Sequence, residues 1–181
     1  MIQQCILQVL EPICEAKFHK KSNGFRPNKS TENAIAQMET LIQLSNYHIV
    51  VDIDIKGFFD NVNHPKLLKQ IWTLGIRDKK LISIISSMLK AEVRGIGIPE
   101  KGTPQGGILS PLLSNIVLNE LDWWIASQWE FFPLEENKRK NKNYYLKNSK
   151  LKRCYIVRYA DDFKIICKKK SDAEKLFIAT K

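Results

Sequence analysis

The chain has few of the residues that hold disulfide-bonded or metal-bound domains together. Its 181 residues include four cysteines and three histidines, and no two cysteines form a C-x-x-C pair. This excludes a zinc knuckle or a disulfide framework, so buried reduced thiols are expected. The histidines also fit no metal-ligand spacing, which favours a solvated or helix-cap position for each of them over metal binding.

Long hydrophobic runs are missing as well. No stretch of 18 apolar residues occurs, and the N-terminal sequence lacks the basic-then-apolar order of a signal peptide. We therefore expect a cytoplasmic protein that has no membrane partner. The hydrophobic content of 44% is nevertheless normal for a chain that folds around a core.

Acidic residues are outnumbered, with 19 Asp and Glu against 29 Lys and Arg, which gives a net charge of +10. Such an excess favours a polyanionic partner such as nucleic acid, although surface lysines also serve solubility. Eight of the cations lie between Asn137 and Arg153 with no acid among them, and they include Lys138, Arg139 and Lys140. This segment is interpreted as a solvated insertion.

Hydrophobic periodicity predicts a chain that mixes helices with a few strands. Apolar residues at helical spacing predict helices over about 1–16, 31–42, 63–75, 78–89 and 111–128. A further helix is expected to open at Ser171, because Ser171 and Glu174 form a capping box. Alternation with a period of two predicts a strand at 49–55 and a hairpin across 154–167, which makes the fold class α/β.

Two pairs of carboxylates stand at unusual places in this pattern. Asp52 and Asp54 share one face of an otherwise apolar strand, and Asp161 and Asp162 lie at the turn of the hairpin. Clustered carboxylates without basic partners repel one another, so protons or hard cations such as Mg²⁺ normally neutralise them. Two Mg²⁺ ions about 4 Å apart serve phosphoryl transfer. Turns also favour aspartate for backbone reasons alone, so either pair by itself decides nothing.

Four ordered sequence blocks accompany these carboxylates. They read GFRPNKSTENAI, DIKGFFDNVNH, GTPQGGILSPLLSNIVLNELD and RYADDF. Together they resemble the conserved blocks of reverse transcriptases encoded by bacterial group II introns. The resemblance implies the palm of a right-hand polymerase, a small antiparallel sheet with packed helices, together with part of the fingers.

The same resemblance implies a domain division. Residues 1–47 would belong to partial fingers, and residues 48–181 to an incomplete palm that carries the basic insertion at 133–153. By the same resemblance, we expect this chain to lack a thumb and the segment that binds the nucleotide triphosphate. The isolated chain is therefore expected to be weakly active or inactive.

The resemblance also assigns the metal ligands. Asp54, Asp161 and Asp162 match the catalytic carboxylates that bind two Mg²⁺ ions, and the carbonyl of Ile55 would complete the shell. Asp52 lies outside the family's ligand set. Its role stays open, although the strand directs it to the same face as Asp54.

Substrate contacts are implied at two further places. Phe59, next to Phe58, matches an aromatic ring that excludes the 2′-hydroxyl of a ribonucleotide, although Phe59 taken without the resemblance is better explained as a core residue. A second group matches nucleotide-contacting positions, namely Gln105, Gly106 and Tyr159. Arg26 and Lys29 resemble finger residues near the template, with an ordinary surface charge as the alternative.

The function implied is RNA-directed DNA polymerisation. A primer 3′-hydroxyl would attack a dNTP on an RNA template, with a DNA primer, and the natural partner would be group II intron RNA. One alternative is a maturase-like RNA-binding module that does not polymerise. Another is a retron or diversity-generating reverse transcriptase. Exposed apolar faces also make self-association an expectation.

Overall fold

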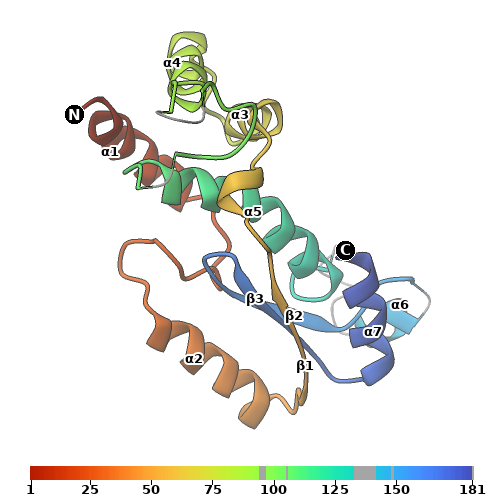
Figure 1. The fold of residues 1–181 in the computed structure, drawn as a ribbon. Coiled ribbons are helices and arrows are strands. Elements are labelled where there is room, and N and C mark those ends of the chain that lie inside the picture. Colours follow the sequence, from red (N-terminus) through yellow and green to blue (C-terminus); the bar gives the residue numbers. More distant parts are fainter. Residues whose placement is uncertain (94–96, 105, 133–141, 148, 181) are drawn as a thin grey trace. The chain divides into compact units, whose positions relative to one another are not determined.

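A computed structural model describes residues 1–93, 97–104, 106–132, 142–147 and 149–180. The chain divides into two compact units. The first unit comprises residues 1–18 and 55–119, and the second comprises residues 19–54 and 120–181. Figure 1 shows the elements in chain colours.

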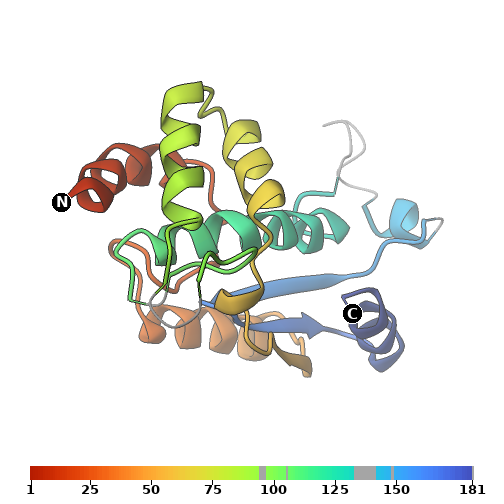
Figure 2. The same cartoon turned by 45° about the horizontal axis from the view of Figure 1, so that its top comes forward.

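The first unit is helical. It contains α1 (Ile2–Glu15), a short 3-10 turn (Phe59–Asn61), α3 (His64–Thr73), α4 (Lys79–Leu89) and the first half of α5 (Ser110–Gln128). The side chains of Asn63 and Asp78 accept hydrogen bonds from the first-turn amides of α3 and α4, which satisfies amides that have no partner inside the helix. These two helices lie side by side in Figure 2.

The second unit contains a three-stranded antiparallel sheet. Its strands are β1 (Ile49–Asp54), β2 (Cys154–Tyr159) and β3 (Asp162–Cys167), in the order β1-β3-β2. The tight hairpin between β2 and β3 and the strand at 49–54 confirm the period-two prediction. The small antiparallel sheet with packed helices agrees with the predicted α/β class.

Helices cover both faces of this sheet. On one face, α2 (Thr31–Glu39) and the π-helical turn Thr40–Leu44 bring Ala34 and Leu41 against Val157 and Ile166. On the other face, the thiol of Cys154 lies 3.8 Å from the carbonyl oxygen of Ile125, in the second half of α5. The last helix, α7 (Lys170–Ala179), packs against β1 and β3. Figures 1 and 2 both show α2 running along the sheet.

Three local expectations need correction. The N-cap of α7 is Lys169, two residues before the predicted cap Ser171, so Ser171 lies inside the helix and its capping box does not form. The basic insertion contains a short helix, α6 (Lys142–Lys147), where only solvated chain was expected. Cys5 is exposed, whereas the other three thiols are buried, and all four are free.

The helices of the described ranges are too short or too polar to cross a bilayer. None of them combines the length and the apolar character that a membrane span requires.

Candidate active site

The register of β1 and β3 brings predicted carboxylates together. Asp54 and Asp162 are direct cross-strand partners, and Asp52 stands opposite Lys164. Because side chains alternate along a strand, all four point to the same face. Asp54 and Asp162 are both exposed, as a site that receives substrates requires. Two carboxylates placed directly opposite repel each other, so this corner of the sheet attracts cations.

The hairpin turn places the third carboxylate. Tyr159 and Asp162 are partners at the end of the β2-β3 ladder, and Ala160 and Asp161 form the turn between them. Ala160 has a φ of 56°, in the left-handed region that side chains rarely adopt, so the turn is strained and needs support from its surroundings. Tyr159 is exposed and Asp161 is half-buried.

Arg158 supplies that support. Its side chain is completely buried, and its guanidinium donates to the carbonyl oxygen of Ala160 at 2.6 Å. It also donates to both carboxylate oxygens of Asp122, the shortest contact being 2.7 Å, and to the hydroxyl of Ser22 at 2.6 Å. The planar fork therefore connects the turn at Ala160 and Asp161 to α5 and to the loop before α2.

Sequence reasoning missed this cluster. Arg158 occupies an inward position of an apolar strand, and a charge at such a position is rarely tolerated without a buried partner. The sequence therefore indicates that Arg158 needs a buried partner. It does not identify that partner, because Asp122 is 36 residues away in the chain.

A close backbone approach also holds the turn. Residues 21–23 run beside β2, where the amide of Arg158 donates to the carbonyl of Lys21 and the amide of Asn23 donates to the carbonyl of Arg158. Gly24 follows, and a Cβ atom placed there would stand 2.0 Å from the backbone nitrogen of Ala160. Only glycine permits this approach.

Lys164 lies among the carboxylates. Its ammonium is 2.6 Å from Asp52 and 2.8 Å from Asp162, so it bridges two acidic side chains of the exposed face. Burial alone would lower the pKa of Lys164, but the hydrogen bonds to Asp162 and Asp52 outweigh burial and raise the pKa. Asp52 therefore has a definite partner, which the sequence left open.

The donor chemistry of this face suits Mg²⁺, which prefers carboxylate and carbonyl oxygens. The described residues nevertheless include no group of three or more His, Cys, Asp or Glu side chains arranged to hold a metal. The ammonium of Lys164 already takes an oxygen of Asp162. The oxygen donors are therefore of the type that Mg²⁺ prefers, but in this structure Lys164 is the cation that neutralises them.

In the first unit, the PQGG turn is joined to the segment that carries Phe59. The amide of Thr103 donates to the carbonyl of Phe59 at 2.8 Å, and the hydroxyl of Ser110 donates to the carbonyl of Pro104 at 2.7 Å. Phe59 is half-buried and meets the buried ring of Phe58 edge-on, with 5.6 Å between ring centroids. An open hollow here is lined by Phe59, Pro104, Gly106, Gly107, Ser110 and Pro111.

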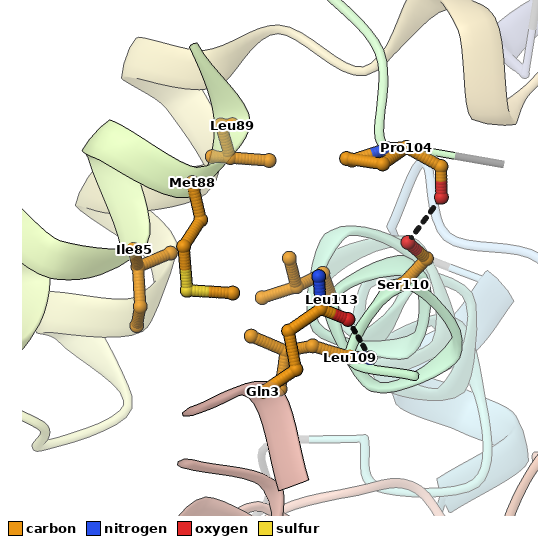
Figure 3. A pocket seen from close by; sticks show the side chains of 8 residues that line it. All are labelled: Gln3, Ile85, Met88, Leu89, Pro104, Leu109, Ser110 and Leu113. Atoms are coloured by element: carbon orange, nitrogen blue, oxygen red, sulfur yellow. Dashed lines mark hydrogen bonds between the residues drawn. The ribbon is translucent and has the colours of Figure 1, made fainter. Parts of the chain in front are cut away.

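The turn is anchored by a buried hydrogen bond and borders an apolar pocket. The buried imidazole of His64 lies 2.6 Å from the carbonyl oxygen of Gly102, whose φ is 92°. Figure 3 shows the apolar pocket on which Pro104 and Ser110 border, formed by side chains of α4 and α5 with Gln3 of α1. Gln105, the residue expected to contact the nucleotide, lies outside the described residues.

Two of the residues predicted to contact nucleic acid, Arg26 and Lys29, bind backbone carbonyls of the preceding loop. Arg26 donates to the carbonyls of His19 and Ser22 at 2.7 and 2.6 Å, so its guanidinium helps to shape the loop before α2. The ammonium of Lys29 lies 3.3 Å from the carbonyl of Lys20. Lys138, Arg139 and Lys140 fall outside the described residues.

Comparison with known proteins points in the same direction as these motifs. The family model described as reverse transcriptase (RNA-dependent DNA polymerase) matches residues 1–181. The chain belongs to the reverse transcriptase family. Two relatives are the protein YkfC of Escherichia coli, 32% identical over 93% of this chain, and the group II intron-encoded protein LtrA of Lactococcus lactis, 37% identical over 84%.

These relatives confirm the predicted resemblance to group II intron reverse transcriptases. The chain spans 48% of YkfC and 26% of LtrA, so it corresponds to half or less of the length of each relative. A telomerase structure from Candida tropicalis matches 97% of this chain and 36% of its own, with a TM-score of 0.60 and 18% identity. At that identity the likeness shows the fold alone, and it confirms the polymerase-like α/β architecture.

Proposed function

We propose that this chain carries the catalytic carboxylates of an RNA-directed DNA polymerase. The observation that carries the proposal is the pairing of Asp54 with Asp162 across β1 and β3, with Asp161 in the adjoining turn. Three carboxylates at one end of a sheet, in a chain of the reverse transcriptase family, supply the hard oxygen donors that phosphoryl transfer requires.

In this proposal Asp54, Asp161, Asp162 and the carbonyl of Ile55 hold two Mg²⁺ ions. Bound there, the ions would activate the primer 3′-hydroxyl and neutralise charge on the dNTP phosphates. The buried fork of Arg158 keeps the Asp161 turn in place, so the carboxylates need little rearrangement during reaction.

In this proposal, residues of the first unit contact the nucleotide, and basic residues of the second unit contact the template and primer. Phe59 lines an open hollow beside the PQGG turn, which suits a ring that contacts a nucleotide sugar. Phe58 backs this ring, Gln105 and Gly106 approach the base pair, and Tyr159 faces the primer end. Arg26, Lys29 and the cations at 138–140 would neutralise phosphates of template and primer.

The proposed partners are an RNA template, a DNA primer and dNTPs, with group II intron RNA as the natural substrate. The similarity to an intron-encoded protein supports this choice. We retain residues 1–47 as partial fingers and 48–181 as palm within the proposal, together with a cytoplasmic location.

Primer extension tests the proposal. The protein expressed from its complete open reading frame is incubated with an RNA template, a DNA primer, dNTPs and Mg²⁺. Asp161→Asn should lower extension by about 10²- to 10⁴-fold, because several kcal/mol of charge stabilisation disappear. Asp172→Asn, the same change in the first turn of α7, should leave extension within about twofold.

Two results would contradict the proposal. One is extension that Asp161→Asn leaves intact. The other is equal RNA binding by both proteins with no extension by either, which is the behaviour of an RNA-binding module.

A further inference from the structure

The sheet face that α2 covers over β2 is exposed over β1, and there it carries four charged side chains, from β1 and β3, that form the corners of a square. Its corners are Asp52 and Lys164, which are cross-strand partners, and Asp54 and Asp162, which are the next pair along the ladder. Cross-strand partners have Cβ atoms about 4.5–5.5 Å apart, so each corner acts strongly on its neighbours. The square therefore holds three negative charges and one positive charge.

The ammonium of Lys164 is shared rather than committed to one carboxylate. It lies 2.8 Å from Oδ1 of Asp162 and 2.6 Å from Oδ1 of Asp52. Both acids are more than half exposed, at 54% and 70%, so water weakens each contact and either can be broken at small cost.

A divalent cation at Asp162 changes this balance. The cation needs the carboxylate oxygens of Asp162, and its charge repels the ammonium of Lys164. Asp52 already accepts a hydrogen bond from the same ammonium, so Lys164 releases Asp162 without losing its remaining partner.

This inference rests on the function proposed above. We propose that Lys164 is an internal counter-ion of Asp162 and that a bound metal ion displaces it. After displacement, the ammonium of Lys164 stays hydrogen-bonded to Asp52. Asp52 thus assists metal loading by holding a lysine, and it is not itself a metal ligand. Lys164 and Asp52 are positioning residues for the metal site.

Metal affinity tests this directly, without any measurement of catalysis. Mn²⁺ is titrated into the chain at about 0.15 M ionic strength, where screening limits charge effects beyond about 8 Å, and free Mn²⁺ is followed by its electron paramagnetic resonance signal. Lys164→Gln removes the competing charge and should tighten Mn²⁺ binding about three- to tenfold. Asp52→Asn leaves Lys164 on Asp162 and should weaken binding by a similar factor.

A double-mutant cycle distinguishes this role from simple charge or from direct ligation. In the Lys164→Gln background, Asp52→Asn should weaken the affinity clearly less than in the wild-type background, because the lysine that Asp52 holds is gone and only the charge of Asp52 itself is lost. Lys175→Gln, which removes one exposed charge from α7, is the matched control and should have no effect beyond about twofold. Circular dichroism verifies that each variant is folded.

The outcomes of these titrations distinguish a failure of the proposed metal site from a failure of the proposed role of Lys164. An equal loss from Asp52→Asn in both backgrounds would mean that Asp52 acts on the metal without Lys164, through its own charge or as a ligand, and would overturn the inference. Unchanged or weaker binding by Lys164→Gln would overturn it too. Asp54→Asn should abolish the Mn²⁺ site; if binding survives that change, the proposed metal site itself fails, and the inference fails with it.

Discussion

Arg158 is the largest side chain that is fully buried in the described part of the chain. A buried charge costs several kcal/mol unless partners replace the lost water. Here Asp122, Ser22 and the carbonyl of Ala160 replace that water with short hydrogen bonds. One residue thus joins three segments at the turn that carries Asp161.

Removing either charge of this pair alone should be costly. Arg158→Met leaves the carboxylate of Asp122 buried without its partner, and we expect a loss of about 3–5 kcal/mol in the free energy of unfolding, measured by urea titration. Arg158→Met combined with Asp122→Leu removes both charges and should recover much of this loss. If the double variant is as unstable as the sum of two single variants, the ion pair is not the stabilising contact.

At the scale of elements, the loop before α2 is attached to the segment that follows α5. Glu130 forms an ion pair of 2.6 Å with Lys21 and lies 3.5 Å from the buried ring of His19. Burial alone would raise the pKa of Glu130, but hydrogen bonds and charge from His19 and Lys21 outweigh it and lower the pKa. The ionised form of Glu130 is therefore more favourable in the folded protein than in the unfolded chain.

This attachment should give a pH-dependent stability. Because the folded pKa of Glu130 lies below its ordinary value of 4.5, its contribution is complete above that pH and is lost as the pH falls through the lower folded value. Glu130→Gln should lower the unfolding free energy by about 1 kcal/mol at pH 7, and the difference should shrink under acid conditions.

Thermal melts of wild type and Glu130→Gln between neutral and acid pH, with Glu174→Gln on α7 as the control, measure this difference. A difference that stays constant as the pH falls well below the ordinary pKa of a glutamate would show that the Lys21 contact does not depend on the ionised carboxylate.

At the scale of the whole molecule, a net charge of +10 accompanies an acidic exposed face that includes Asp52, Asp54 and Asp162. This combination suits a protein that binds phosphates through its cations and metal ions through its carboxylates. The cations of residues 138–153 and of residues 168–170 form two clusters in the sequence. The role of the first cluster in binding nucleic acid is a prediction from its sequence.

Salt dependence separates these clusters. The affinity for an RNA–DNA duplex should fall linearly with salt on logarithmic axes, with a slope set by the number of neutralised phosphates. Changing Lys138, Arg139 and Lys140 to glutamine should reduce the slope by about 2 to 3 if each contacts one phosphate. The same change at Lys168, Lys169 and Lys170 removes equal charge from exposed positions and should reduce the slope by less than about 1. Equal reductions would assign binding to net charge alone.

Local patterns determined much of this protein. Alternation along 49–55 predicted β1, and the residues around Asp161 predicted the hairpin. The helices predicted over 63–75 and 78–89 begin at His64 and Lys79. Each is a property of neighbouring residues, so propensity and spacing suffice to find it. The four motifs likewise indicated the reverse transcriptase family by their residues and order alone.

Other features were decided only by tertiary structure. The partner of Arg158, the lysine beside Asp52 and the approach of Gly24 to Ala160 all join residues far apart in the chain. The failure of the Ser171 capping box shows the same limit, because α7 starts one residue before it. Strand register and burial determine which distant charges meet, and no local pattern in the sequence records that pairing. The sequence alone thus identified the carboxylates, whereas the fold determined which cations stand beside them.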